Sequence, residues 1–472
     1  PLDHQQPYSG PCQIHFLVWF NESRLSALTG DDDMKRTLTT LALALSMSLL
    51  SLPSDAQSHL VKLTNHLEPY GFFRTSAAFD AREVKTDSED LFYYLPYDSV
   101  INGDGYDIWY NPSLKLSALT TRLGFNLTGF QYGALKVTGK LETDFHLLNK
   151  GAASLHLREA YLNFGWNDLG KVVGSVDLKV GHAWHPMSLD MPCTVGYEAG
   201  SPFNPYARSP QLTASVSFLR HFSFTAGALY PMEFMPTGPQ GPSADYVKYG
   251  LIPELYAGLA FSTGHFTAKA GVDFLSLKPR WRTLADTYYY YKGTTVKDRV
   301  SMISPMCYAE YSKGTFKVNA KAVLASGGDH LRLLGGYALY DRSDPLNYKY
   351  TPLRSLTAFV STSYGDQWQF MFMAGGMMAL GTSHDLLTDY ETNNVVPDNI
   401  YYFDGGFKNV RDVVRVAPAV AFNLDRLTVA LEYNGSCVWY GDINSLSSRG
   451  VAVNNIHNII NHRVLGVVKY SF

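Results

Sequence analysis

The segment LKVTGKLETDFH, from Leu135 to His146, decides the fold class of this chain. Its odd-numbered positions hold Leu, Val, Gly, Leu, Thr and Phe, and its even-numbered positions hold Lys, Thr, Lys, Glu, Asp and His. Successive side chains of a β-strand point to opposite faces, so the segment predicts a strand that is apolar on one face and ionisable on the other. The end of the chain repeats this pattern between Ile460 and Phe472.

Alternating segments of this kind recur along residues 69–472 and are separated by turn-forming residues. The clearest segments begin at Leu123, Leu212, Phe222, Phe266, Phe316, Leu356, Trp368, Val416 and Leu427. Weaker segments lie near 69–80, 154–165, 172–184, 250–262 and 299–311. Together with the two segments above they predict about sixteen strands, an even number.

The connections between these segments alternate in length. Short turns are expected at Gln131-Tyr132, Leu219–His221, Ser262–Gly264, Ser312–Gly314, Gly365-Asp366 and Asp425-Arg426. Between the turns lie long polar segments rich in Gly, Pro, Asn and Tyr, near 81–112, 185–208, 231–249, 276–298, 326–352, 381–409 and 441–459.

This asymmetry predicts an all-β, transmembrane, antiparallel up-and-down β-barrel with short periplasmic turns and long extracellular loops. In hydrocarbon every backbone N–H and C=O must be paired internally, so strands can cross a membrane only as a closed barrel. A soluble sandwich gives no reason to place every long loop at one end. About sixteen strands enclose a lumen too wide for side chains to fill, so we expect the interior to hold water.

Composition supports a sheet and excludes several other classes. Charged residues make up 17% of the chain and aromatic residues 14%, which excludes disorder, coiled coil and collagen. The mean hydropathy of −0.11 argues against a helical membrane bundle. Removing the three basic and six acidic residues of the first 56 positions from the totals of 39 and 42 leaves 36 of each. A near-neutral remainder predicts no nucleic-acid partner.

The first 56 residues are expected to lie outside the barrel. From Met34 the chain has two basic residues, an apolar stretch from Leu38 to Leu52, and small residues before Gln57. This is the pattern of a secretory signal peptide, predicted over 34–56 with cleavage near Ala56. Residues 1–33 show no periodicity and are interpreted as a non-native upstream extension. One barrel domain is predicted over 57–472.

Three places in the sequence resemble outer-membrane general porins, and most of all the DcaP-like trimeric porins. The chain ends in KYSF at Phe472, similar to the C-terminal signal that barrels present to their insertion machinery. The segments Arg158–Phe164 and Val180–Trp184 look like the fourth and fifth strands of these porins, and Arg208–Leu212 is similar to the DcaP-like pattern.

The resemblance implies a bacterial outer-membrane porin that passes small hydrophilic solutes by passive diffusion. It also implies a homotrimer with one chain per barrel, contact with outer-membrane lipid, and insertion machinery that binds through Phe472. In sixteen-stranded porins the third extracellular loop folds into the lumen, and here that loop is Pro186–Ala207. Its acidic groups, such as Asp190 and Glu198, would then face basic side chains of the wall.

Inward-facing charges are assigned from the phase of each strand, and basic residues outnumber acidic ones about two to one. We therefore predict a mild preference for anions. The alternative is that these side chains only keep the wall wetted. The pore-lining candidates are Arg122, Lys136, Lys140, Arg158, Lys179, Asp190, Glu198, Arg208, Lys269, Lys317, Lys321 and Arg463.

Arg158 conflicts with this phase assignment. The resemblance places it in the pore, yet Leu162 and Phe164 share its parity on the same strand and are expected to face lipid. A subunit interface at this position would relax the conflict, because an outward face covered by a neighbour need not be apolar.

The sequence offers little support for catalysis or for a cofactor. No GxSxG motif, P-loop or zinc-ligand spacing is present, so we predict that the chain is not an enzyme. His182 and His185 have the spacing of metal ligands but no evident third ligand, and an aromatic cluster with Trp184 is expected instead. The alternatives to a diffusion porin are a substrate-specific channel, a barrel-type lipid hydrolase, and a structural or adhesive barrel plugged by its loops.

Overall fold

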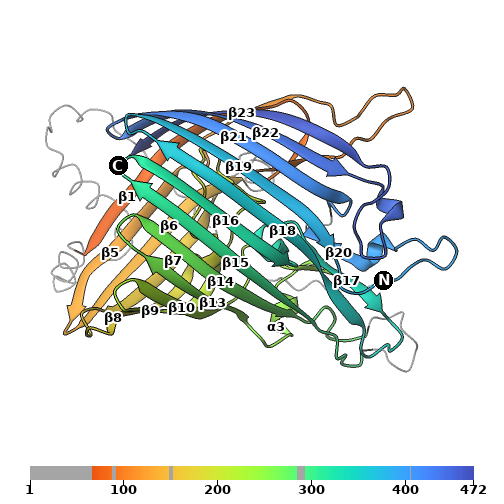
Figure 1. The fold of residues 1–472 in the computed structure, drawn as a ribbon, viewed down its shortest axis with the longest axis horizontal. Coiled ribbons are helices and arrows are strands. Elements are labelled where there is room, and N and C mark those ends of the chain that lie inside the picture. The colour runs from red at the N-terminus through yellow and green to blue at the C-terminus, as the bar shows by residue number, and fades with distance from the viewer. Residues whose placement is uncertain (1–65, 88–91, 148–152, 284–292, 404–405) are drawn as a thin grey trace, which may run out of the picture. The chain divides into compact units, whose positions relative to one another are not determined.

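The computed structural model describes residues 66–87, 92–147, 153–283, 293–403 and 406–472. In these residues sixteen antiparallel strands form a closed barrel (Figure 1). The last strand pairs with the first, with Phe72 opposite Ser471 and Asp80 opposite Arg463. The predicted extension and signal peptide, and residues 57–65 of the predicted barrel domain, lie outside the described residues.

The sixteen barrel strands correspond to the sixteen predicted segments. In chain order they are β1 (Leu67–Asp80), β5 (Arg122–Tyr132), β6 (Leu135–Leu147), β7 (Ala153–Trp166), β8 (Val173–Trp184), β9 (Arg208–Phe218), β10 (Phe222–Leu229), β13 (Glu254–Ser262), β14 (Phe266–Leu277), β15 (Val300–Lys313), β16 (Phe316–Ser326), β18 (Lys349–Tyr364), β19 (Trp368–Gly381), β21 (Val410–Leu424), β22 (Leu427–Tyr440) and β23 (His457–Ser471).

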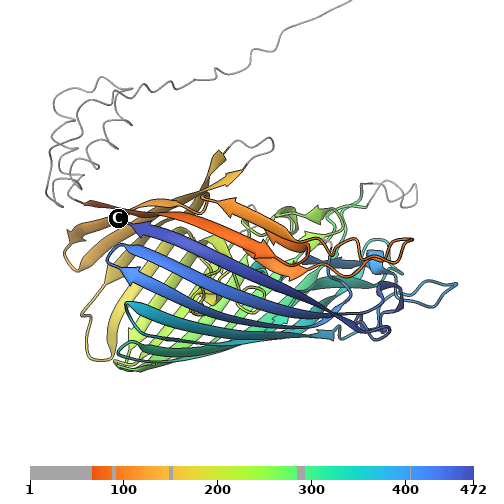
Figure 2. The ribbon, with the colours of Figure 1, turned by 90° about the horizontal axis from the view of Figure 1, so that it is seen from above.

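Smaller elements belong to the connections. They are β2 (Val84–Asp87), β3 (Phe92–Pro96), β4 (Ser113–Ser117), η1 (Pro186–Ser188), β11 (Thr237–Gly238), β12 (Gly241–Pro242), α3 (Asp245–Lys248), η3 (Asp329–Leu331), β17 (Gly336–Asp341), η4 (Pro397–Asn399), β20 (Ile400–Tyr402) and η6 (Ile443–Ser445). Among the described residues, no helix is long and apolar enough to span a membrane. Figure 2 shows the short turns at one end of the barrel and the long loops at the other.

The two faces of the wall differ as the alternation predicts. On β6 the side chain of Leu141 points outward and is 45% exposed, whereas the next residue, Glu142, is 4% exposed. Asp144 on the same inward face is 1% exposed. A soluble barrel would have the opposite polarity, so the apolar outer surface is the one that meets lipid.

Strand β7 carries an extra residue at Arg158. Glu142 and Thr143 are consecutive on β6, but their partners on β7 are two positions apart, which leaves Arg158 as a β-bulge. The bulge changes the phase of the strand, so Leu157 before it and Leu162 after it are both exposed while Arg158 is buried. This irregularity resolves the conflict in the sequence without requiring a subunit interface.

The interior is expected to hold water, but on one side of the lumen the long loops pack it with apolar side chains. Phe92 of the first loop (81–112), Phe203 of the third loop and Phe403 pack with inward-facing side chains of β18, β19, β21 and β22 in one buried apolar cluster. Phe203 lies against Gly375, where a Cβ atom would come within 2.4 Å of the ring. The long loops therefore fill space that the side chains of the wall cannot reach.

We expect Phe203→Ala to weaken the attachment of the third loop. Removing a fully buried ring leaves a cavity and costs about 3–5 kcal/mol. The measurement is the unfolding temperature of the purified barrel in detergent. Leu212→Ala is the control, because Leu212 lies on the outer face and is 51% exposed. Equal destabilisation by the two substitutions would contradict the packing of Phe203.

Candidate pore constriction

The third loop crosses the lumen and is tied to the opposite wall through its backbone. Glu432 of β22 accepts a hydrogen bond from the Val195 N–H at 2.6 Å, and Ser361 of β18 accepts one from the Cys193 N–H at 2.9 Å. Arg415 of β21 donates to the Ser201 carbonyl at 2.7 Å. Polar inward-facing residues thus satisfy loop backbone groups that would otherwise be buried without partners.

Lys321 of β16 is an anchor for the third loop. Its Nζ donates to the Met187 carbonyl at 3.0 Å, to the Leu189 carbonyl at 2.5 Å and to Asn204 Oδ1 at 2.7 Å. The side chain is almost completely buried, so it offers no charge to a passing solute. Lys321 faces inward, but the structure places it under the third loop.

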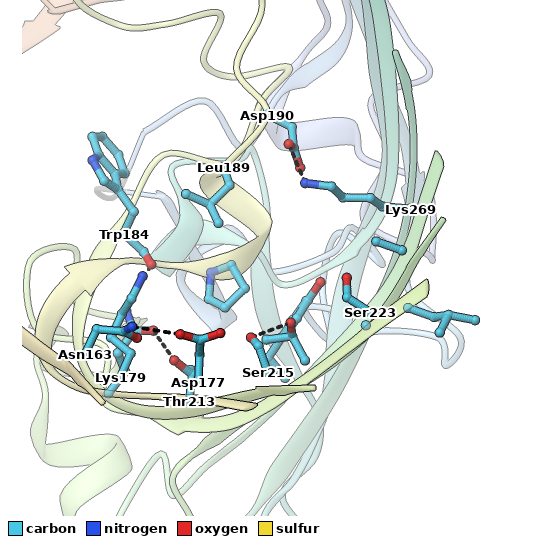
Figure 3. Close-up of a pocket in the computed structure, with 17 residues that line it drawn as sticks. Asn163, Asp177, Lys179, Trp184, Leu189, Asp190, Thr213, Ser215, Ser223 and Lys269 are labelled. Atoms are coloured by element: carbon cyan, nitrogen blue, oxygen red, sulfur yellow. Dashed lines mark hydrogen bonds and ion pairs between the residues drawn. The ribbon is translucent and has the colours of Figure 1, made fainter. Parts of the chain in front are cut away.

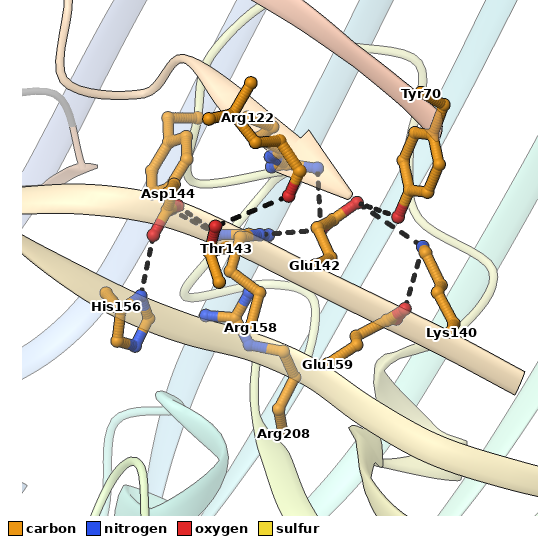
Figure 4. Close-up of polar contacts among 12 residues, drawn as sticks. Tyr70, Arg122, Lys140, Glu142, Thr143, Asp144, His156, Arg158, Glu159 and Arg208 are labelled. Atoms are coloured by element: carbon orange, nitrogen blue, oxygen red, sulfur yellow. Dashed lines mark hydrogen bonds and ion pairs between the residues drawn. The ribbon is translucent and has the colours of Figure 1, made fainter. Parts of the chain in front are cut away.

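The bulge residue Arg158 organises a charged network on the β6–β7 wall (Figure 4). Its Nε donates to Glu142 at 2.9 Å, and its Nη1 donates to Asp144 at 2.7 Å and to the Tyr197 hydroxyl at 2.5 Å. Tyr197 in turn donates to Asp144 at 2.7 Å. Burial raises the pKa of the Tyr197 hydroxyl, and the nearby Tyr206 raises it further, so this group remains a donor.

The network continues through neighbouring cations. Lys140 lies 2.8 Å from Glu159 and 3.4 Å from Glu142, and Arg122 lies 3.5 Å from Glu142. The guanidinium of Arg122 also lies 5.3 Å from the centroid of the Phe72 ring. Acidic and basic groups are therefore interleaved on this wall, and neither charge dominates it.

Arg208, at the start of β9, pairs with Glu233 in the loop between β10 and β13. Its Nε lies 3.0 Å from the Glu233 carboxylate, and its guanidinium lies 4.7 Å from the Trp184 ring centroid. Burial opposes ionisation of Glu233, but the charge of Arg208 and its hydrogen bonds outweigh burial and lower the pKa of this carboxyl. The pair fixes the base of that loop against the wall.

Cavities lie on both sides of the third loop. One, of about 630 Å³, is lined by Tyr197, Tyr206 and Arg208. A second, of about 440 Å³, is also lined by Tyr197 and Tyr206, so these two side chains lie between the two spaces. The third loop therefore meets the arginine-rich wall between these two cavities.

The second cavity has a basic lining. Arg74, Arg122 and Lys469 line it, and its described lining contains no acidic side chain. Arg74 donates to the Val195 carbonyl at 3.0 Å, and the Lys469 Nζ lies 5.6 Å from the Phe72 ring centroid. Any solute in this space therefore faces three cations.

A third cavity, of about 290 Å³, lies between the third loop and strands β8, β9, β13 and β14 (Figure 3). Asp190 of the loop pairs with Lys269 at 2.6 Å, which is the kind of contact that the resemblance implies. Asn163 donates to Asp177 at 2.9 Å beside Lys179. Charges of both signs are present in this cavity.

The remaining predicted residues occupy different environments. Lys136 is exposed next to the β5–β6 turn, and Lys317 pairs with Glu310 at 2.8 Å near the β15–β16 turn. Glu198 is buried in the third loop. Arg463 is buried beneath the first loop, where it pairs with Asp80 at 2.9 Å and lies 5.2 Å from the Tyr93 ring centroid. The role of each of these residues in selectivity stays a prediction.

Sequence reasoning missed Arg74 and Glu233. Arg74 alternates with outward-facing Phe73 on β1, so the pattern of that strand could have identified it. Glu233 lies in a long loop, and no sequence signal connects it with Arg208. One His/Asp group on the wall, Asp144 with His146 and His156, has atoms spaced closely enough for a metal, but Asp144 is already bonded to Arg158 and Tyr197.

Comparisons with known proteins support the fold. No protein family matches the chain, and no curated protein sequence matches it. Among solved structures, the outer membrane channel DcaP of Acinetobacter baumannii is similar, with a TM-score of 0.60 and 17% identity over 86% of this chain and 97% of that chain. OmpT of Vibrio cholerae matches with a TM-score of 0.48 and 12% identity over 86% of this chain and 97% of that chain. The likeness to DcaP establishes a porin-like barrel fold.

We expect Lys321→Met to release the third loop from β16. The substitution leaves three buried acceptors without their donor, each of which costs about 1–3 kcal/mol. Limited proteolysis should then cut the third loop faster than in the unmodified protein. Lys136→Met, at an exposed position, should leave the cleavage rate unchanged. A third loop that resists protease equally in both variants would rule out this anchoring role.

Proposed function

We propose that the chain is a bacterial outer-membrane porin that admits small hydrophilic solutes by passive diffusion and prefers anions. The proposal rests on one observation above all: a loop crosses the closed barrel but leaves a cavity of about 440 Å³ lined by Arg74, Arg122 and Lys469. Fixed charges in a narrow aqueous space set the potential that a permeating ion meets. DcaP, whose fold is similar, is an outer membrane channel, which favours the same function.

A structural barrel without conduction is the second candidate. The apolar cluster of loop and wall residues that includes Phe92, Phe203 and Phe403 favours it, because this cluster closes one side of the lumen. Reconstitution into a planar bilayer separates the two candidates. Stepwise ionic currents are expected for a porin, and a purified, folded barrel without currents would establish the structural alternative.

We predict that Arg74→Gln combined with Lys469→Gln shifts selectivity toward cations. The change removes two of the three cations that line the second cavity, so the Cl⁻ to K⁺ permeability ratio should fall about two- to threefold. The measurement is the reversal potential in a KCl gradient. Lys171→Gln is the matched control, since it removes an exposed cation from the β7–β8 turn that is not a pore-lining candidate. An unchanged ratio in the double variant would remove the basic cavity from the ion path.

The C-terminal residue supports the proposal that insertion machinery recognises this chain. Phe472 exchanges two backbone hydrogen bonds with Gly71, at 3.0 and 3.3 Å, and its ring centroid lies 5.3 Å from that of Phe73. Phe472 therefore lies at the seam where β23 meets β1.

We also propose that barrels assemble as homotrimers through their apolar outer faces, which chemical cross-linking of membranes would test.

Deleting Phe472 should lower the amount of barrel in the outer membrane several-fold. The matched control is Tyr470→Phe, which keeps an aromatic side chain on the outer face of the same strand. Folded barrel is measured by heat-dependent gel mobility. Normal yield after the deletion would show that neither closure of the β1–β23 seam nor recognition by the insertion machinery depends on Phe472.

A further inference from the structure

Four ionisable side chains meet in the lumen wall at the loop end of β13 and β14. Glu254 begins β13 and Asp273 lies near the end of β14, while His185 precedes η1 in the third loop and His330 belongs to η3. All four side chains are almost completely buried. The cluster therefore joins two loops to two strands.

The donor atoms of these side chains converge. His330 Nε2 lies 2.9 Å from Glu254 Oε1 and 3.7 Å from Asp273 Oδ2. His185 Nε2 lies 3.2 Å from the same Glu254 oxygen and 3.7 Å from Asp273 Oδ1. For comparison, the donor atoms of a tetrahedral zinc site with bonds near 2.1 Å are about 3.4 Å apart.

These atoms lack the hydrogen bonds that buried polar groups normally have. Both histidine Nε2 atoms, Glu254 Oε1 and Asp273 Oδ1 lie within ion-pair distance of one another, but among the described residues none of them makes a well-directed hydrogen bond. Burying such an atom without a partner costs about 1–3 kcal/mol, and more for a charged group. Several of them in one place indicate a bound ligand that satisfies them together.

The two histidines have different roles because their Nδ1 atoms have different neighbours. His185 Nδ1 accepts the Met187 N–H at 3.1 Å, so a neutral His185 carries its proton on Nε2 and donates toward the carboxylates. His330 Nδ1 instead faces Asp329 Oδ1 at 3.9 Å. A proton on that nitrogen leaves the lone pair of His330 Nε2 directed at Glu254 and Asp273, as in carboxylate–histidine–metal arrangements.

Charge supports a divalent cation. Glu254 and Asp273 bring two negative charges into a buried place, and His330 balances only one of them even when it is protonated. His185 cannot become doubly protonated while its Nδ1 accepts the Met187 N–H. An ion of charge +2 balances the two carboxylates, whereas buried carboxylates without a counter-charge are strongly unfavourable.

We propose that Glu254, Asp273 and His330 bind a divalent transition-metal ion of the zinc type, with His185 donating a hydrogen bond to the carboxylate ligands. One imidazole and two carboxylates form a donor set suited to such ions. The ion holds η3 and the start of the third loop against the β13–β14 wall. Sequence patterns did not reveal this site, because they suggest only the nearby His182 as a partner of His185, whereas Glu254, Asp273 and His330 lie far along the chain.

The proposal is tested by the metal content of the full-length barrel, purified in detergent from cells grown with added zinc. Elemental analysis after exhaustive dialysis should find about one zinc ion per chain. His330→Gln should lose most of this zinc. His156→Gln is the matched control, because it alters the other His/Asp group on the wall, and it should retain the zinc.

A second measurement needs no variant. Removing the ion with a chelator at elevated temperature should lower the unfolding temperature of the unmodified barrel, since a ligand that binds only the folded state stabilises it. Chelation should not affect His330→Gln. Cobalt loading of the unmodified protein should give the visible absorption of a four-coordinate site.

Three outcomes would overturn the proposal. The unmodified barrel could carry no stoichiometric zinc and be indifferent to chelator. The His330→Gln variant could retain as much zinc as the unmodified barrel. The zinc could disappear with His156→Gln instead, which would place it at the outer group.

Discussion

The requirement that every backbone hydrogen bond be satisfied within the chain governs this structure. A strand that faces lipid has no water to pair with its N–H and C=O groups, so the sheet has to close on itself. Closure occurs along β1 and β23, where nine consecutive residues pair from Phe72 with Ser471 to Asp80 with Arg463. Once the sheet is closed, the apolar face of each strand lies outside and the polar face lies inside.

The inward polar face then becomes the framework on which the loops are arranged. Lys321, Arg415 and Glu432 are charged residues of the wall, yet they bind the backbone of the third loop. Arg158 is likewise held by Glu142 and Asp144, and Arg208 is held by Glu233. A charge on the inner face can therefore hold a loop or line a space open to solvent. Arg74, Arg122 and Lys469 are the described cations that line the second cavity.

Period-two alternation was sufficient to predict the strands, because one face of each strand meets lipid and the other faces the lumen. The same alternation showed a parity conflict at Arg158 but could not resolve it, since an extra residue at this position inverts the phase of β7. It also could not separate Lys321, which lies beneath the third loop, from Lys269, which lies in a cavity. That difference depends on where the loops fold. The cluster of His185, Glu254, Asp273 and His330 was invisible for the same reason, because loop folding brings its members together.

The bulge in β7 allows this wall to change through a single mutation. Because the residues on either side of Arg158 already pair with consecutive residues of β6, loss of that single codon would restore an uninterrupted ladder. Leu157 and Leu162 would keep their outward orientation, and the cylinder would survive the deletion. Glu142 and Asp144 would then lose Arg158, the cation they share. The net charge of the β6–β7 wall would become more negative through a single deletion.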